Sequence, residues 1–150
     1  MMKDLKTAIT LLAPIAVFIF DRGLKWLFIH SWSEVIFPLG QWLSLRLAFN
    51  SGVAFGLPVN YWLIIILYLL AFGALSYYGL ILFCRKNSGQ LLSLLLVWVG
   101  AWSNFLDRLY YARVIDYIDV RYFSIFNLAD CAIVGGLIFL VWSAYRQEAE

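Results

Sequence analysis

The chain has 150 residues, of which 64% are hydrophobic and only 13% are charged, with 11 basic and 9 acidic side chains. Soluble domains are usually about 45–50% apolar and about 25% charged, so a chain this short would not bury the excess in one core. This composition excludes a soluble globule or a disordered segment, and a net charge of only +2 argues against nucleic-acid binding. We therefore expect an integral membrane protein.

Four apolar segments are long enough to cross a bilayer as helices, which takes about 20 residues each. In chain order they cover about residues 7–29, 60–83, 90–106 and 123–145. The segments are too evenly apolar for the strands of a membrane barrel, which alternate over about ten residues. The sequence predicts an all-α membrane protein with four transmembrane helices and a single domain over residues 1–150.

The first segment follows Lys3 and Lys6 and resembles a secretory signal peptide. No small-residue cleavage site follows it, so we expect an uncleaved anchor. To reach a full span it must continue through Asp21 and Lys25, which are four residues apart with the acid first, the favourable order for an ion pair within a helix. The pair is either an interfacial salt bridge that fixes the helix end or a contributor to a site.

The connection between the first and second segments, residues 31–58, is too long for a tight turn. Within it, residues 43–49 alternate leucine or phenylalanine with Ser44, Arg46 and Ala48, and a period of two predicts a strand. A turn at Asn50 to Gly52 follows. We expect a small β-platform between the first two helices, lying on the membrane surface.

Polar side chains recur at regular spacing in the last two segments. The third ends with Asn104, Asp107 and Arg108 on one helical face, and Asn127 and Asp130 repeat the spacing of three in the fourth. Ionisable groups at membrane depth cost several kcal/mol, so their default interpretation is functional. For Asp130 the alternative is a polar contact that holds helices together.

Two further acidic residues, in the predicted loop between these segments, suggest carboxylate chemistry. Two carboxylates in a low-dielectric site share one proton, so the ionised one can accept a proton from water while the protonated one polarises a carbonyl. No H-E-x-x-H or G-x-S-x-G motif is present, although a Mg²⁺ ion bound by carboxylates remains an alternative. Spacing leaves open which two form the pair among Asp107, Asp116, Asp119 and Asp130.

Five segments, in order and over nearly the whole chain, resemble motifs of the signal peptidase II family, the bacterial aspartyl proteases that process lipoproteins. The similarities are of DRGLK (21–25) to D-x-x-x-K, NSGVAFG (50–56) to N-x-G-x-A-F-G, GAWSNFLDR (100–108) to G-A-x-G-N-x-x-D-R, VIDYI (114–118) to V-x-D-F, and FNLAD (126–130) to F-N-x-A-D. Each motif is weak alone, whereas five in the right order on four spans are specific.

This resemblance implies a membrane endopeptidase that removes the signal peptide from prolipoproteins, cutting before a cysteine that carries diacylglycerol. It implies Asp116 and Asp130 as the catalytic dyad, without a metal or other cofactor. It implies substrate-binding or supporting roles for Asp21, Lys25, Asn50, Gly52, Asn104, Asp107, Arg108 and Asn127. Ser103 departs from the family pattern, which has Gly there, and would tighten helix packing or shift Asn104.

Nearly equal numbers of basic residues would lie on the two sides of the membrane, so charge alone leaves the orientation open. The resemblance implies that both termini are cytoplasmic, and that the site and platform lie toward the outer face of the bacterial inner membrane. The implied partners are the lipidated prolipoprotein and membrane lipids, with no nucleic acid. We expect a monomer, because one chain supplies the site.

Two alternative functions belong to other classes. A small ion or proton transport protein would also hold carboxylates within its helices. An inactive paralogue would bind lipid-modified peptides without cutting them. Neither accounts for the five ordered motifs.

Overall fold

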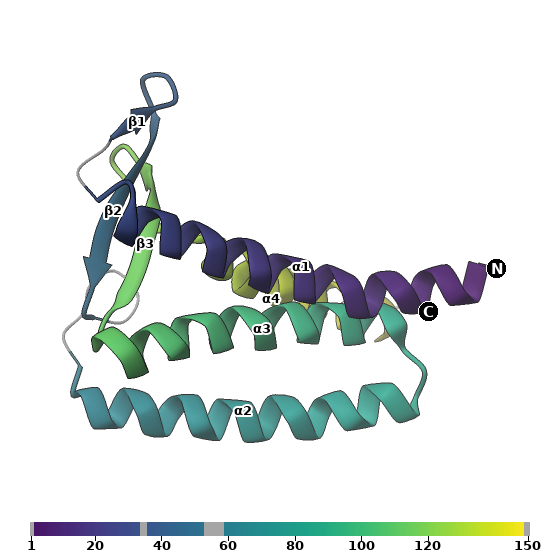
Figure 1. The fold of residues 1–150 in the computed structure, drawn as a ribbon. Coiled ribbons are helices and arrows are strands. Elements are labelled where there is room, and N and C mark those ends of the chain that lie inside the picture. Colours follow the sequence, from purple (N-terminus) through teal and green to yellow (C-terminus); the bar gives the residue numbers. More distant parts are fainter. Residues whose placement is uncertain (1, 34–35, 53–58, 149–150) are drawn as a thin grey trace.

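The computed structural model of the chain describes residues 2–33, 36–52 and 59–148. Four long helices dominate it (Figure 1): α1 (Met2–His30), α2 (Tyr61–Cys84), α3 (Ser88–Tyr111) and α4 (Leu128–Glu148). Each contains a stretch that is long and apolar enough to cross a membrane. The prediction of a helical membrane protein with four spans is confirmed.

The last two helices differ in their bounds from the predicted spans. α3 continues past residue 106 to Tyr111, where Ala112 ends it in the left-handed conformation with φ of 56°. α4 begins at Leu128 rather than at residue 123, because Ile125 and Phe126 pair as a strand instead. Asp130 therefore lies in the first turn of α4, not well inside the span as predicted, and Asn127 precedes the helix.

A four-stranded antiparallel sheet, ordered β1-β2-β3-β4, covers one end of the helices (Figure 1). Its strands are β1 (Phe37–Pro38), β2 (Leu43–Asn50), β3 (Val114–Val120) and β4 (Ile125–Phe126). β2 confirms the strand expected over residues 43–49. β1 and β2 come from the connection between α1 and α2, as predicted, but β3 and β4 come from the connection between α3 and α4. The predicted platform is therefore only half of the sheet.

Strand β3 corrects one prediction about the acidic residues. Asp116 and Asp119 were expected in a loop, but both lie on β3, where they pair with Ala48 and Ser44 of β2. The sequence of β3 explains this, since its valine and isoleucine residues favour an extended backbone between the acids.

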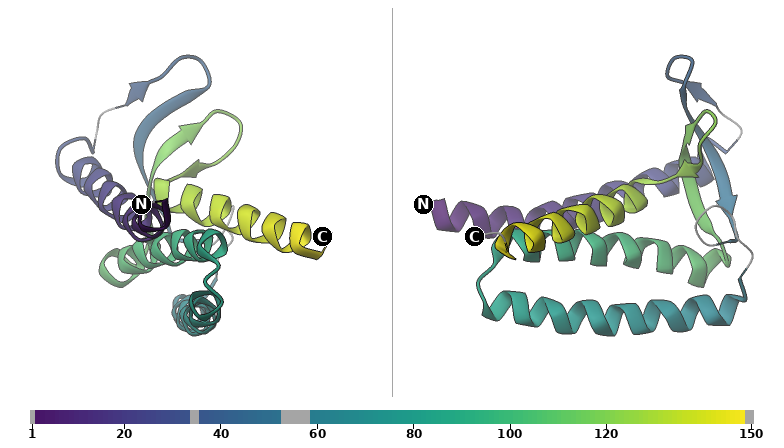
Figure 2. Two further views of the ribbon diagram at one scale, coloured as in Figure 1. Left: turned by 90° about the vertical axis from the view of Figure 1, so that its right-hand side faces the viewer. Right: turned by 180° about the vertical axis from the view of Figure 1, so that it is seen from behind.

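Helix α3 is the central element, with α1, α2 and α4 arranged around it when the molecule is viewed along the helices (Figure 2). The α3–α4 contact is close because glycine occupies it. A Cβ atom at Gly100 would lie 2.5 Å from the Ala129 carbonyl oxygen, and one at Gly136 would lie 2.6 Å from the Ser93 carbonyl oxygen. Small residues of this kind let membrane helices approach backbone to backbone.

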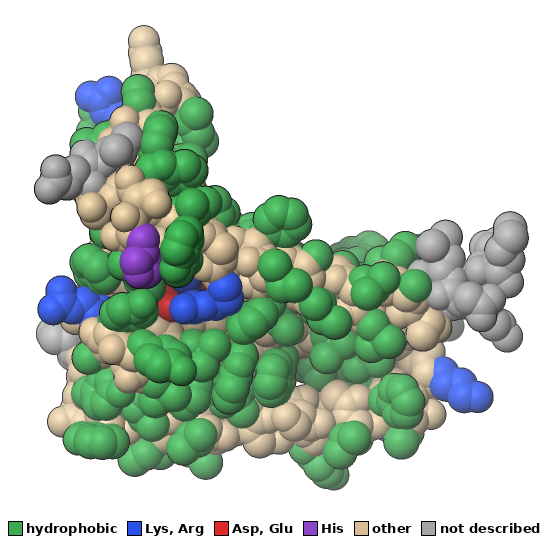
Figure 3. Space-filling view, in the orientation of Figure 1, with side chains coloured by type: hydrophobic (Ala, Val, Ile, Leu, Met, Phe, Trp, Pro, Cys, Tyr) green, Lys and Arg blue, Asp and Glu red, His purple; other side chains and the backbone are tan. Residues whose placement is uncertain are grey.

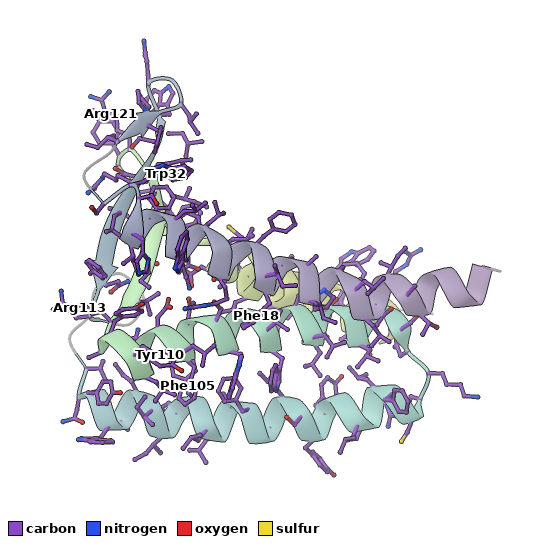
Figure 4. All side chains as sticks on the ribbon, viewed as in Figure 1. Phe18, Trp32, Phe105, Tyr110, Arg113 and Arg121 are labelled. Carbon is purple, nitrogen blue, oxygen red and sulfur yellow. The ribbon has the colours of Figure 1, made fainter. Side chains whose placement is uncertain are left out.

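Helix α2 packs on α3 through aromatic side chains. Phe105 points from α3 toward α2 (Figure 4), and its ring centroid is 5.4 Å from that of Phe72 on α2. Away from this contact the helices expose apolar side chains, which cover most of the helical surface in Figure 3. Trp62 and Leu70 of α2, for example, are 70% and 66% exposed. Such a surface suits contact with lipid.

Candidate active site

A buried ion pair joins α1 to α3. Lys25 Nζ lies 2.9 Å from Asp21 Oδ2 and 2.7 Å from Asp107 Oδ2, and all three side chains are fully buried. Lys25 also donates to the Asn104 side-chain oxygen at 2.9 Å. The predicted pairing of Asp21 with Lys25 is therefore present, but inside the protein rather than as an interfacial bridge.

Two of the four candidate carboxylates are neutralised by cations. Asp107 binds Arg22 as well as Lys25, and its Oδ2 accepts the Ile115 backbone N–H at 3.3 Å. Asp119, farther out on β3, lies 2.6 Å from Arg46 Nε. These pairs fix α1, α3 and the sheet relative to one another.

The other two candidates, Asp116 and Asp130, are held by amides instead. Asn104 Nδ2 donates to Asp130 Oδ1 at 2.7 Å, and Asn127 Nδ2 donates to Asp116 Oδ1 at 2.7 Å. Among the described residues, neither carboxylate has a salt-bridge partner within 4.0 Å. The spacing of the sequence left four candidate carboxylates. The ion pairs distinguish Asp116 and Asp130, which have no cationic partner within that distance among the described residues, from the other two.

Asn127 connects these two carboxylates. Its Oδ1 accepts the backbone N–H of Asp130 at 2.8 Å, as a residue that caps a helix N-terminus does, while its Nδ2 holds Asp116. The same Nδ2 lies 3.2 Å from Asn104 Oδ1, so the amides of the two asparagines are in contact. The predicted Asn–Asp pairs therefore meet in one cluster.

The protonation of Asp116 reflects its surroundings. The side chain is on β3, and burial raises its pKa from the usual 3.8 to about 6, with the negative charge of Asp130 acting in the same direction. The hydrogen bond from Asn127 opposes the rise in pKa without cancelling it. Asp116 therefore keeps its proton to a higher pH than an ordinary aspartate, as a proton-sharing pair requires.

An apolar groove of about 770 Å³ opens beside Asp130. Asn50, Asn104 and Arg108 line it together with Asp130. Its apolar lining comes from α2, α3 and α4 and includes Ile64, Leu67, Val97, Ala101, Ile133 and Val134. The arrangement suits a ligand that has both an apolar and a polar part.

Arg108 places positive charge in this groove. Its Nη2 donates to the Gly52 carbonyl oxygen at 2.6 Å, whereas Nε and Nη1 are buried with no partner among the described residues. Asn50 Oδ1 accepts the Gly52 N–H at 3.1 Å. Residues 53–56, the rest of the predicted N-x-G-x-A-F-G segment, lie outside the described residues.

Two residues have a larger part than sequence analysis assigned. Tyr117, given no role, donates its hydroxyl to Asp21 Oδ1 at 2.9 Å, and Ser103, noted only as a departure, donates to Asp21 Oδ2 at 2.5 Å. No spacing rule links residue 117 to residue 21, although its place beside Asp116 was a signal. Within the described residues, no group of three or more His, Cys, Asp or Glu is placed to hold a metal ion.

Comparison with known proteins gives consistent results. A family model described as signal peptidase (SPase) II matches residues 13–146. The lipoprotein signal peptidase of Polynucleobacter necessarius is 32% identical, with 98% of this chain and 95% of that protein covered. The lipoprotein signal peptidase of Syntrophomonas wolfei is 43% identical over 66% of each chain. A solved bacterial membrane enzyme structure covers 94% of this chain and is itself 90% covered, at 25% identity and a TM-score of 0.83.

Proposed function

The chain belongs to the signal peptidase II family, and on this premise we propose that it is an aspartic endopeptidase acting on diacylglyceryl-modified prolipoproteins. It removes the signal peptide by cutting before the lipidated cysteine. One observation carries the proposal: Asp116 and Asp130 are joined through Asn127 and form no salt bridge among the described residues, at the polar end of an apolar groove.

In the proposed reaction, the two carboxyl groups share one proton. The ionised carboxylate takes a proton from water, and the resulting hydroxide attacks the scissile carbonyl, which the protonated carboxyl polarises by donating a hydrogen bond. The tetrahedral intermediate then breaks its C–N bond, and a carboxyl group gives its proton to the leaving amine. The raised pKa of Asp116, about 6, supports the sharing of a proton, because this buried carboxyl keeps its proton to a higher pH than an ordinary aspartate does.

The groove supports the choice of substrate. Its apolar part, between α2 and α4, suits the acyl chains of a lipidated cysteine, and its polar end places Asp130 beside Asn50 and Arg108. Arg108 Nε and Nη1, which have no partner among the described residues, can donate to a peptide carbonyl oxygen of the substrate. Asn104 and Asn127 donate hydrogen bonds to the two carboxylates of the dyad. Lys25 in turn donates to Asn104, and Asp21 and Asp107 hold Lys25.

We further propose that both termini are cytoplasmic and that the site faces the outer leaflet of the inner membrane. The two ends of the chain and the α2–α3 turn lie at one end of the helices, and the sheet at the other (Figures 1 and 2). The dyad lies at the end with the sheet, because Asp116 is on β3 and Asp130 is in the first turn of α4. A single chain contributes every residue of the site, which supports a monomer.

The deciding experiment uses the purified protein in detergent micelles with a diacylglyceryl-modified prolipoprotein. The wild-type protein should release the signal peptide, with or without a chelator. Asp116→Asn and Asp130→Asn should each lower kcat by at least about a thousandfold, since either change removes one proton-transfer group. Asp119→Asn is the matched control, because Asp119 is also an acid on the sheet but is paired with Arg46.

Three outcomes would contradict the proposal. Cleavage retained in both dyad variants would remove the assigned dyad, and equal cleavage of unlipidated precursor would remove the assigned substrate. Binding of the lipidated precursor without any cleavage by the wild-type protein would favour the inactive paralogue.

A further inference from the structure

The buried carboxylate of Asp21 lies where α1, α3, β3 and α4 meet. Its Oδ2 accepts hydrogen bonds from Lys25 Nζ at 2.9 Å and Ser103 Oγ at 2.5 Å. Its Oδ1 accepts from Tyr117 Oη at 2.9 Å and from the Ala129 backbone N–H at 3.1 Å. One carboxylate thus contacts a residue from each of four elements.

Two of these four donors are hydroxyl groups on different elements. Ser103 is fully buried and Tyr117 is 2% exposed, so water has little access to replace either hydroxyl. The motifs that the chain resembles have Gly and Phe at these positions, neither of which carries a hydroxyl. Relative to these motifs, each side chain has an extra hydroxyl, and both hydroxyls donate to the same carboxylate, that of Asp21.

The contacts of Asp21 and Tyr117 continue to the start of α4. Tyr117 Oη accepts the backbone N–H of Leu128 at 3.0 Å, while Asp21 accepts that of Ala129. The first N–H groups of a helix have no partner within the helix, so these bonds fix the position of its N-terminus. The next residue along α4 is Asp130, one of the proposed catalytic pair.

We propose that Ser103 and Tyr117 are positioning residues that act together through Asp21 to hold the first turn of α4, and with it Asp130, in the geometry of the reaction. Ser103 fixes one oxygen of the Asp21 carboxylate, and Tyr117 fixes the other while also holding Leu128. Neither Ser103 nor Tyr117 is among the residues that line the groove. The inference rests on the proposed function, since the dyad is its reference point.

The test is a double-mutant cycle with Ser103→Ala, Tyr117→Phe and the combined variant, in the cleavage assay described above. Each single change removes only a hydroxyl, and we expect kcat to fall roughly fivefold with KM changed less than twofold, because a bond to a buried charge is lost away from the substrate. The kcat of the double variant should be about equal to that of the less active single variant, because the loss of either hydroxyl already frees the same carboxylate. A role in stability alone would lower the melting temperature and leave kcat per folded molecule unchanged.

Ser93→Ala is the matched control. Ser93 is also a buried serine of α3, but its hydroxyl donates to the Gly89 carbonyl oxygen of its own helix and to no other element among the described residues, so kcat should not change. If Tyr117→Phe does not fold, Ser103→Ala and Ser103→Gly carry the test, and both should show the same fall in kcat.

The outcomes separate this inference from the proposed function. Wild-type cleavage that Asp130→Asn abolishes, but that both hydroxyl variants leave unchanged, would overturn the inference alone. A double variant whose loss equals the product of the single losses would overturn the shared action through Asp21. A wild-type protein that cleaves nothing would overturn the proposed function and this inference together.

Discussion

At the scale of single residues, Asp116 occupies a place that opposes its ionisation. It is 2% exposed, and its pKa is raised from 3.8 to about 6 in the folded protein. Between these two pH values the folded protein keeps a proton that the unfolded chain has lost. The stability that this proton contributes is complete below about pH 4 and is lost as the pH rises through about 6.

Asp116→Asn should therefore make the protein more stable at pH 8, where wild-type Asp116 is ionised. The gain in the free energy of unfolding is at most about 3 kcal/mol, from a pKa shift of about two units. Unfolding followed in detergent micelles at pH 8 and pH 4 measures it, and the difference between variant and wild type should vanish at pH 4. Asp119→Asn, which loses the Arg46 pair instead, should show no gain. A gain of equal size at both pH values would contradict the assignment to ionisation.

The sequence predicted the local relations of the site residues and not the distant ones. The spacing of Asp21 and Lys25 indicates an ion pair, because residues four apart share a helical face. The same spacing rule says nothing of Asp107 on another helix, which Lys25 also binds. For this reason spacing alone left four carboxylates as candidates, since the cations that pair with Asp107 and Asp119 come from distant parts of the chain.

At the scale of elements, the contact between α3 and α4 helps to set the position of Asp130, which lies in the first turn of α4. Gly136 lies where a Cβ atom would be 2.6 Å from the Ser93 carbonyl oxygen and 2.7 Å from Val97 Cγ2. The backbone of α3 is on the other side of this contact, so α4 would have to move away to admit a methyl group.

Gly136→Ala should destabilise the protein by about 1–3 kcal/mol, the usual range for overpacking, and should lower cleavage because α4 carries Asp130. Thermal unfolding and the cleavage assay measure the two effects. Gly135→Ala is the control on the same helix, since a Cβ atom there meets nothing within 4 Å. Equal destabilisation by the two substitutions would contradict the role of the α3–α4 contact, because alanine has a higher helix propensity than glycine at both positions.

Hydropathy predicted the existence of the elements better than their ends. Residues 123–127 are mostly apolar, and an apolar run extends a predicted span whether it folds as a helix or as a strand. In the structure Ile125 and Phe126 pair with β3, and α4 begins only after Asn127 caps it. By contrast, β2 was predictable from its alternating pattern alone.

At the scale of the whole molecule, the two termini lie at the end of the helices opposite the sheet (Figures 1 and 2). The connections between the strands expose large aromatic side chains, such as Trp42 at 65% and Tyr122 at 83%, which suit a membrane–water interface. Arg121 lies over the Tyr122 ring at 5.0 Å, and Figure 4 places it at the outer end of the sheet.

The proposed orientation predicts the behaviour of reporter fusions in bacterial cells. Alkaline phosphatase, which folds only outside the cytoplasm, should be inactive at the C-terminus and active when inserted at Gly40, an exposed turn residue between β1 and β2. A fluorescent protein that becomes fluorescent only in the cytoplasm should be fluorescent when it is fused to the C-terminus. Phosphatase activity at the C-terminus would reverse the assignment of sides.

The salt bridge within α1 has a consequence for how the protein is made. α1 is synthesised before α3, so during insertion Asp21 and Lys25 have not yet met Ser103, Asn104 or Asp107. A lone charge in the bilayer is costly, but an acid and a base one helical turn apart can neutralise each other, and in the folded protein Lys25 Nζ lies 2.9 Å from Asp21 Oδ2. The first helix therefore carries a counter-ion for Asp21 into the membrane, and the folded protein keeps this pair while adding Asp107 of α3 as a second partner of Lys25.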